Sequence, residues 1–249
     1  MESNQIGDLA HADHPIAAPL GDDGVDRLLA RAVTGRGTVL DLGCGDGSWL
    51  LRALRLEPSL TAVGVDHSDA GFGRMREQAE REGLADRLQL VHADATSWTS
   101  DDRFDVVLSV GATHAYGGLV PTLAAIDGHL RPGGVALVGE CFWEQPPSPR
   151  VLDVLGAEPD DYGDLAATVE VAAASGWVPL HGHVSTLEEW DDYEWSWTGA
   201  LARWALDHPD DPDRDQVMAA SVEHRRAWLE GYRGTLGFVT LLLGRSPAS

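Results

Sequence analysis

The stretch Thr38-Val39-Leu40-Asp41-Leu42-Gly43-Cys44-Gly45-Asp46-Gly47 decides the fold. Its first five residues form a short apolar run that is typical of a buried strand, and three glycines at alternate positions follow. Apolar residues then return with helical spacing from Ser48 to Leu56, and Pro58 lies just past that segment. Because glycine lets the backbone turn tightly, Gly43 and Gly45 allow it to approach a ligand closely. The stretch therefore predicts a strand, a ligand-binding turn and a helix.

Strands and helices alternate on both sides of this turn. We expect strands at 38–42, 60–65, 88–92, 104–110, 135–142, 177–184 and 236–243, and helices at 25–33, 48–56, 70–82, 119–130 and 162–174. Such alternation is typical of βαβ units and predicts an α/β fold with a mostly parallel sheet. The residues 131–134 read as a turn before the fifth strand.

The last two expected strands are separated by an acidic, tryptophan-rich stretch that is too long for a hairpin loop. We interpret this stretch as a helical cap inserted before the last strand. The chain then divides into an irregular N-terminal arm at 1–24, a ligand-binding core at 25–186, the cap at 187–232, and the last core strand with its tail at 233–249.

Composition limits the functions that are open to this chain. Its 249 residues carry a formal net charge of −22, and none of them is lysine. An acidic surface repels phosphate backbones and anionic bilayers, so we expect neither nucleic acid nor membrane as a partner. The missing lysine excludes Schiff-base chemistry and a lysine-bearing phosphate loop. Two distant cysteines and no signal-like segment predict a cytoplasmic location, and the histidine spacings predict no metal site.

Two aspartates follow the next two expected strands. Asp66 ends the second strand, where a carboxylate can accept hydrogen bonds from both hydroxyls of a ribose. The alternative for Asp66 is a solvated turn residue. Asp94 lies just past the third strand, where it can accept a hydrogen bond from the exocyclic amine of an adenine. The alternative for Asp94 is a helix-capping or turn role.

The ordered segments VLDLGCGDG, VGVDHS, HADAT, FDVVLSVGA and LRPGGVALVGE resemble the class I S-adenosylmethionine-dependent methyltransferase family over roughly 25–142. The less specific GATHAYGG, ECFWEQPP and EEWDDYEW resemble bacterial small-molecule methyltransferases of the ubiquinone-methyltransferase-like kind. The resemblance implies a Rossmann-like three-layer sandwich with a seven-stranded, mostly parallel sheet and an antiparallel last strand. The rival is a nicotinamide or flavin Rossmann enzyme, whose fingerprint would place a glycine at Ser48.

The resemblance also implies S-adenosyl-L-methionine as cofactor and S-adenosyl-L-homocysteine as product. It assigns Asp41 and Gly43 to the methionine part of the cofactor, with Gly45 in the same turn, and Ser109 to the edge of the sulfonium. It assigns Asp66 to the ribose. Asp94 and the Ala95 amide would bind the adenine, and His67 would lie beside the adenine ring.

Methyl transfer is an in-line displacement that depends mainly on aligning the acceptor atom with the methyl group and the sulfur. Residues after the fourth and fifth strands should face the methyl group, because ligands bind at the carboxyl ends of parallel strands. His114 is the candidate base, and Tyr116 is a second polar group; the alternative for His114 is a capping or backbone contact. Glu140 could orient a substrate hydroxyl or pair with an amine, or make a structural hydrogen bond to the loop after the fourth strand.

Aromatic residues supply the candidate substrate contacts. Helical spacing puts Trp190, Tyr193 and Trp197 on one face of the cap, and Trp143 follows the fifth strand. These rings could hold a cationic or flat substrate, or simply pack on the core. We expect a methyltransferase that modifies an O or N atom of a small molecule, and we leave a homodimer open. The alternatives are a cofactor-binding regulator or scaffold without activity, and an enzyme that methylates a peptide or protein.

Overall fold

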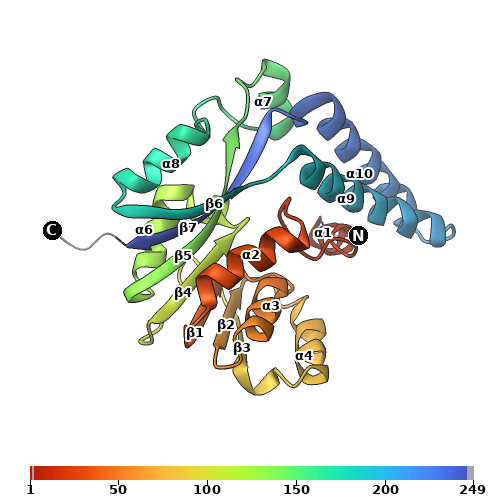
Figure 1. The fold of residues 1–249 in the computed structure, drawn as a ribbon. Helices are drawn as coiled ribbons and strands as arrows, with labels where there is room; N and C mark the ends of the chain where they lie inside the picture. The colour runs from red at the N-terminus through yellow and green to blue at the C-terminus, as the bar shows by residue number, and fades with distance from the viewer. Residues whose placement is uncertain (2, 246–249) are drawn as a thin grey trace. The chain divides into compact units, whose positions relative to one another are not determined.

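The apolar run before the glycine turn forms β1, an interior strand of the sheet (Figure 1). The structure is a computed structural model that describes residues 1 and 3–245. Within these residues the sheet has seven strands in the order β3-β2-β1-β4-β5-β7-β6. They are β1 (Thr38–Leu42), β2 (Thr61–Asp66), β3 (Leu88–His92), β4 (Phe104–Val110), β5 (Leu130–Trp143), β6 (Trp177–Val184) and β7 (Leu236–Arg245).

The pairing of the strands confirms the predicted fold class. β1 pairs in parallel with β2 and with β4, and the parallel pairs β2–β3 and β4–β5 extend the sheet on both sides. The last strand, β7, runs antiparallel to β6. The carboxyl ends of β1, β2, β3 and β4 therefore meet at one edge of the sheet, where the predicted ligand residues follow them.

One strand boundary was predicted wrongly. β5 begins at Leu130, so the residues 131–134 that we expected to form a turn lie inside the strand. Leu130 pairs with Phe104, and the register then shifts before Val106 pairs with Val135. The pairing with β4 thus accommodates the proline and glycines as an irregularity of the sheet.

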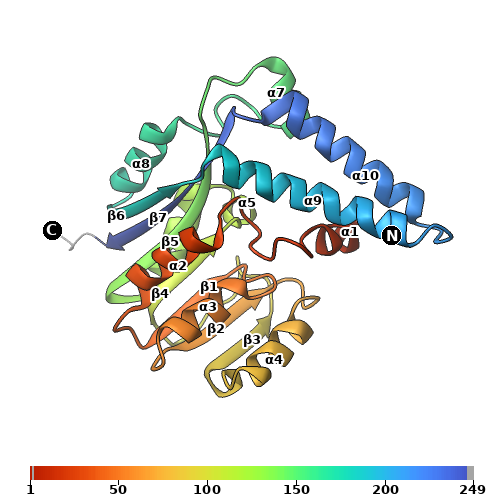
Figure 2. The same ribbon diagram turned by 45° about the vertical axis from the view of Figure 1, so that its right-hand side comes forward.

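Helices cover both faces of the sheet (Figures 1 and 2). One group packs side by side and comprises α2 (Asp22–Val33), α3 (Ser48–Leu56) and α4 (Phe72–Arg81). The other group comprises α6 (Leu119–Asp127) and α8 (Leu165–Ala174). α2 shows why these segments are helical: Val25, Leu28 and Leu29 recur at helical spacing, and all three are buried. Two single turns, η1 (Ala85–Arg87) and α5 (Thr113–Tyr116), complete this part.

The chain divides into two compact units. The sheet unit comprises Gly21–Glu140, Leu165–Val184 and the residues from Phe238 onward, and the helical unit comprises Met1–Leu20, Cys141–Asp164 and Ser185–Gly237. The helical unit holds α1 (Ser3–Ala10), α7 (Pro149–Leu155), α9 (Leu187–Asp207), α10 (Arg214–Ala227) and the π-helical turn η2 (Trp228–Tyr232). No helix of the described residues is long and apolar enough to cross a bilayer.

The long helix α9 organises the helical unit. It begins at a capping box in which the Thr186 side chain accepts from the Glu189 amide while the Glu189 carboxylate accepts from the Thr186 amide. α10 packs along it (Figure 2). The expectation of an irregular N-terminal arm was wrong for α1, because Ile6, Leu9 and Ala10 pack against the buried cluster of α9 and α10. Tertiary packing thus stabilises a helix that is too short to be stable alone.

Candidate active site

The three glycines of the turn adopt left-handed conformations, with φ of 89° at Gly43, 53° at Gly45 and 76° at Gly47. This region favours glycine, which has no Cβ. A Cβ at Gly43 would lie 2.8 Å from the Cβ of Ala112 in the loop after β4. The Gly43 amide donates to the Val65 carbonyl at 2.9 Å, which ties the turn to β2. The turn therefore exposes backbone at the carboxyl edge of the sheet, where a Cβ would not fit.

The carboxylate of Asp66 holds the turn from the neighbouring strand. Asp66 is buried at the end of β2, and its Oδ2 accepts from the Gly45 amide at 2.8 Å. Its Oδ1 accepts from the Ser68 amide at 2.9 Å and lies 3.2 Å from Nδ1 of the exposed His67. A carboxylate can accept about four hydrogen bonds, so Asp66 retains acceptor capacity for ribose hydroxyls. It is a buried anchor of the turn, a role that differs from the solvated turn residue we had considered.

Asp94 follows β3 in a tight turn. Its Oδ1 accepts from the Thr96 hydroxyl at 2.7 Å and from the Thr96 amide at 2.8 Å, and these bonds lower the pKa of Asp94. Its side chain is exposed. The turn role that the sequence left open is therefore present, and it fixes the carboxyl group while leaving Oδ2 to accept from a ligand.

Asp41 lies at the floor of this region, on β1. Its side chain is 3% exposed, and burial followed by the nearby carboxylates of Asp66 and Asp46 raises its pKa to about 7. Burial, followed by the charges of Asp41 and Asp66, raises the pKa of the Cys44 thiol far above its usual range. Cys44 is therefore a protonated, unreactive thiol, and the floor of the site is a negative region that favours a cationic ligand.

The one-turn helix α5 carries His114 and Tyr116. His114 is exposed, whereas Tyr116 is half-buried and its hydroxyl donates to the Ala95 carbonyl at 3.0 Å. Burial, with smaller contributions from Asp94 and Asp41, raises the pKa of Tyr116 to about 12. Such a phenol keeps its proton at neutral pH. The structure thus groups Tyr116 with the adenine-side residues, a placement that the sequence did not reveal because 20 residues separate it from Ala95.

Three polar residues lie near the carboxyl ends of β4 and β5. They are Ser109 on β4, Thr113 on α5 and Glu140 on β5. Ser109 is fully buried, and among the described residues its hydroxyl has no hydrogen-bond partner. The hydroxyl of Thr113 donates to Oε1 of Glu140 at 3.2 Å, and both side chains are buried. This is the structural bond that we considered as one alternative for Glu140. The bond ties the Glu140 carboxylate to Thr113, the residue that precedes His114 in the segment after β4.

In the helical unit, the four aromatic residues predicted to bind substrate each pack against other side chains. Trp143 is buried in a cluster with Trp228 and Tyr232, and its Nε1 donates to the Pro159 carbonyl at 3.0 Å. Trp190 lines a cavity of about 280 Å³. Trp190 therefore borders a space that a ligand can enter.

The other two rings of the predicted set contact histidines. The Tyr193 ring lies 5.9 Å from the ring of His11 and 5.3 Å from that of His14. Trp197 stacks on His224 with 3.8 Å between ring centroids. Both arrangements are packing contacts of the kind that the alternative interpretation predicted, and the part they play toward a substrate stays a prediction.

Sequence reasoning missed a buried polar network beside these rings. Glu194 is 1% exposed, accepts from the Tyr232 hydroxyl at 2.7 Å, and lies 2.7 Å from Nε2 of His224. Burial, then the Glu194 charge and hydrogen bond, raises the pKa of Tyr232. The signal that could have revealed Glu194 is its position four residues after Trp190 and four before Thr198, on the buried face of α9. No group of three or more metal-ligating side chains occurs in residues 1 and 3–245.

Comparison with known proteins finds methyltransferases that resemble this chain in sequence and in structure. A methyltransferase domain model matches residues 39–134. YjhP of Escherichia coli (strain K12) is 28% identical over 222 residues, which are 88% of this chain and 89% of YjhP. The ribosomal protein L11 methyltransferase of Xylella fastidiosa is 38% identical over 142 residues, 55% of this chain and 44% of that relative. The structure of a SAM-dependent methyltransferase from Geobacter sulfurreducens in complex with S-adenosyl-L-homocysteine has a TM-score of 0.88 at 28% identity, covering 97% of this chain and 98% of that one.

The residues of the sheet unit suit S-adenosyl-L-methionine. The carboxylates of Asp41, Asp46 and Asp66 favour its sulfonium and ammonium charges, and the glycine turn allows close approach. Asp66 and Asp94 keep acceptor capacity for a ribose and an adenine. The protein has a Rossmann-like methyltransferase fold and is an S-adenosylmethionine-dependent methyltransferase, with S-adenosyl-L-methionine as its cofactor.

Proposed function

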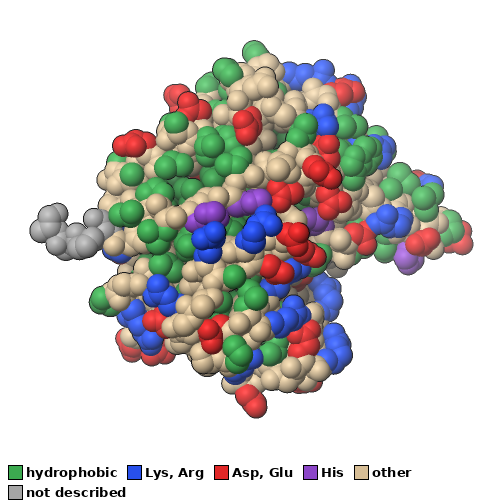
Figure 3. Space-filling view, viewed as in Figure 1, with side chains coloured by type: hydrophobic (Ala, Val, Ile, Leu, Met, Phe, Trp, Pro, Cys, Tyr) green, Lys and Arg blue, Asp and Glu red, His purple; other side chains and the backbone are tan. Residues whose placement is uncertain are grey.

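We propose that this enzyme transfers the methyl group to an O or N atom of a small molecule. The observation that carries the proposal is charge: a chain with a formal net charge of −22 and no lysine repels nucleic acid. On the face in Figure 3, basic side chains lie scattered among acidic ones. A neutral or cationic small acceptor suits such a protein.

A protein acceptor is the second candidate, because the Xylella fastidiosa relative is a ribosomal protein L11 methyltransferase. That match covers 55% of this chain and 44% of the relative, whereas the match to YjhP covers 88% and 89%. The segment shared with the L11 methyltransferase therefore leaves out much of each protein, including regions that could select the methyl acceptor. We rank the small molecule ahead for this reason.

The proposed mechanism assigns proton handling to the ends of β4 and β5. When bound, S-adenosyl-L-methionine supplies an electrophilic methyl group. His114, exposed on α5, receives the proton that the acceptor hydroxyl or ammonium group loses. Glu140, fixed by Thr113, orients the acceptor through its carboxylate. Tyr116 keeps its proton, because its raised pKa disfavours the phenolate, and its hydroxyl holds the Ala95 carbonyl on the cofactor side.

The acceptor class can be tested with S-adenosyl-L-methionine that carries a radioactive methyl group. The purified enzyme is incubated with a cell extract separated by size into small-molecule, protein and RNA fractions. We expect label in the small-molecule fraction and formation of S-adenosyl-L-homocysteine. Label in the protein fraction alone would identify the second candidate, and donor binding without turnover in any fraction would favour a regulator or scaffold.

The assignment of His114 has its own test. His114→Ala should lower kcat by roughly 10²- to 10⁴-fold, the usual contribution of a positioned base, with little change in donor affinity. The control is His208→Ala, an exposed histidine directly after α9 in the helical unit. An unchanged kcat in His114→Ala would remove His114 from the mechanism.

A further inference from the structure

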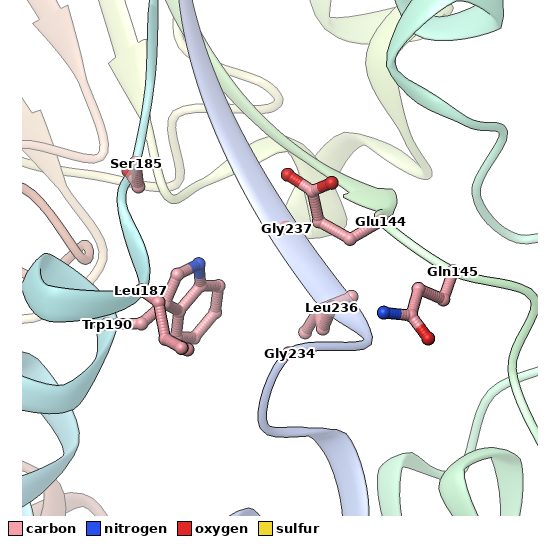
Figure 4. Close-up of a pocket in the computed structure, with 8 residues that line it drawn as sticks. All are labelled: Glu144, Gln145, Ser185, Leu187, Trp190, Gly234, Leu236 and Gly237. Atoms are coloured by element: carbon pink, nitrogen blue, oxygen red, sulfur yellow. The ribbon is translucent and has the colours of Figure 1, made fainter.

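The helical unit contains a cavity whose walls come from three segments (Figure 4). Leu187 and Trp190 lie on one side, on the first turn of α9, and Glu144 and Gln145 lie on the other, in the loop after β5. The volume is about 280 Å³. The lining residues are Glu144, Gln145, Ser185, Leu187, Trp190, Gly234, Leu236 and Gly237. This is enough space for a ligand with one aromatic ring.

Two buried polar atoms of the lining have no partner. Within the part of the chain that the structure describes, neither Nε1 of Trp190 nor Oγ of Ser185 makes a hydrogen bond. Ser185 is 6% exposed, and both residues border the same cavity. Buried polar groups are nearly always paired in folded proteins, so a ligand that reaches these two residues from the cavity would supply partners that the described residues do not. Trp190 offers a donor, and Ser185 offers a donor or an acceptor.

The walls are held in place by contacts of their own. The Trp190 ring meets the ring of Tyr193 edge-on at 6.4 Å and that of Tyr232 at 6.3 Å. The Tyr232 hydroxyl in turn donates to the buried carboxylate of Glu194 at 2.7 Å. On the other wall, the Glu144 amide donates to the Thr235 carbonyl at 2.9 Å. These contacts restrict the motion of the cavity walls, which lowers the cost of binding.

Charge determines which ligand fits. Glu144 is the charged member of the lining set, and its side chain is exposed. Arg233 directly precedes the lining residue Gly234, and its guanidinium donates two hydrogen bonds to Asp191, of 2.8 and 2.7 Å. An indole ring and a carboxylate together favour a cation.

We propose that this cavity is a binding site for a small organic amine that carries an aromatic or other apolar body. The ammonium group pairs with Glu144, the body lies between the Trp190 ring and Leu236, and an acceptor atom at the far end of the ligand takes the Trp190 N–H. The proposal does not depend on the acceptor class assigned above, because it concerns binding within the helical unit.

The test uses tyramine and tyrosol, which share a phenol ring and differ in an ammonium against a hydroxyl group. Proton–nitrogen correlation spectra of the full chain report the Trp190 indole N–H, identified as the signal that Trp190→Phe removes. We expect tyramine to shift this signal saturably and to bind on the order of tenfold more tightly than tyrosol, as a charge-assisted hydrogen bond allows.

Glu144→Gln should bring the two affinities within about threefold of each other by removing the charge. The matched control is Glu188→Gln, which removes an exposed carboxylate of the same α9 turn that does not line the cavity. The control should keep the preference for tyramine. The proposal is overturned if the Trp190 signal does not respond, if tyrosol binds as tightly to the unaltered chain, or if Glu188→Gln removes the preference as fully as Glu144→Gln.

Discussion

The sheet unit and the helical unit bury carboxylates in different ways. In the sheet unit, Asp66 is buried at a strand end, where it accepts from the backbone amide of Gly45 in the neighbouring turn and from that of Ser68 just after it. In the helical unit, Glu194 is buried in the middle of a helix, where the side chains of Tyr232 and His224 surround it. The first arrangement depends on backbone donors, which the order of the strands and the glycine turn place beside the carboxylate. The second needs three side chains from separate segments, so it should be the more sensitive to a single substitution.

The largest effect is expected at Glu194. Glu194→Ala leaves the Tyr232 hydroxyl and the His224 ring without their shared partner, and breaking a buried polar pair costs about 3–5 kcal/mol of unfolding free energy. Urea denaturation measures the loss. Glu188→Ala, an exposed acid of the same helix, should stay within about 0.5 kcal/mol of the unaltered chain. Equal losses in both variants would show that the network does not stabilise the helical unit.

The glycine turn offers a comparison within the sheet unit. Gly43→Ala and Gly45→Ala share the strain of a positive φ, but only the first places a Cβ 2.8 Å from Ala112. We expect Gly43→Ala to lose about 2–3 kcal/mol and Gly45→Ala about 1 kcal/mol. Calorimetry with S-adenosyl-L-homocysteine should also show the larger loss of affinity in Gly43→Ala. A reversed order of the two variants would contradict the close approach of the turn to the loop after β4.

The pH dependence of the unfolding free energy should reveal the ionisation of the Asp41 carboxyl group. Its pKa is about 7 in the folded chain and 3.8 in an exposed state, so the folded chain binds this proton more tightly. The stability that the protonated acid contributes is complete below about pH 4 and is lost as the pH rises through about 7. The cofactor-free Asp41→Asn variant should therefore gain on the order of 2 kcal/mol relative to the unaltered chain between about pH 5 and 8. A difference that does not change with pH would mean that Asp41 ionises normally.

A smaller effect is expected for cofactor affinity at Asp66. Asp66→Ala removes the acceptor for the ribose and the anchor of the Gly45 amide, which should weaken binding of S-adenosyl-L-homocysteine by about 1–2 kcal/mol. Asp86→Ala, an acid of the η1 turn, serves as the control. Calorimetry that finds the same affinity in Asp66→Ala would refute the contact with the ribose.

The sequence was most informative where a local pattern determines the structure. The apolar run of β1 and the glycines after it predicted the strand, the turn and the start of α3, and the comparisons confirm the fold, the family and the cofactor. The roles of His114 and Glu140 in methyl transfer stay predictions, as does the part of the aromatic residues toward a substrate.

Features that depend on distant residues escaped prediction. α1 is helical because of its packing on α9 and α10, and β5 starts early because of its pairing with β4. Glu194 finds its partners 30 and 38 residues further along the chain, and no local pattern in the sequence indicates that distance. Spacing along a helix shows which side chains share a face, but the partner on the other side is set by tertiary structure.

The hydrogen bond from the Gly45 amide to Asp66 has a kinetic consequence. Both partners of this bond belong to the chain, so the bond restricts the glycine turn to one conformation whichever ligand binds. Encounter with S-adenosyl-L-methionine then requires little rearrangement of the turn, and most differences in affinity between ligands of this site should appear as differences in how long each one stays bound.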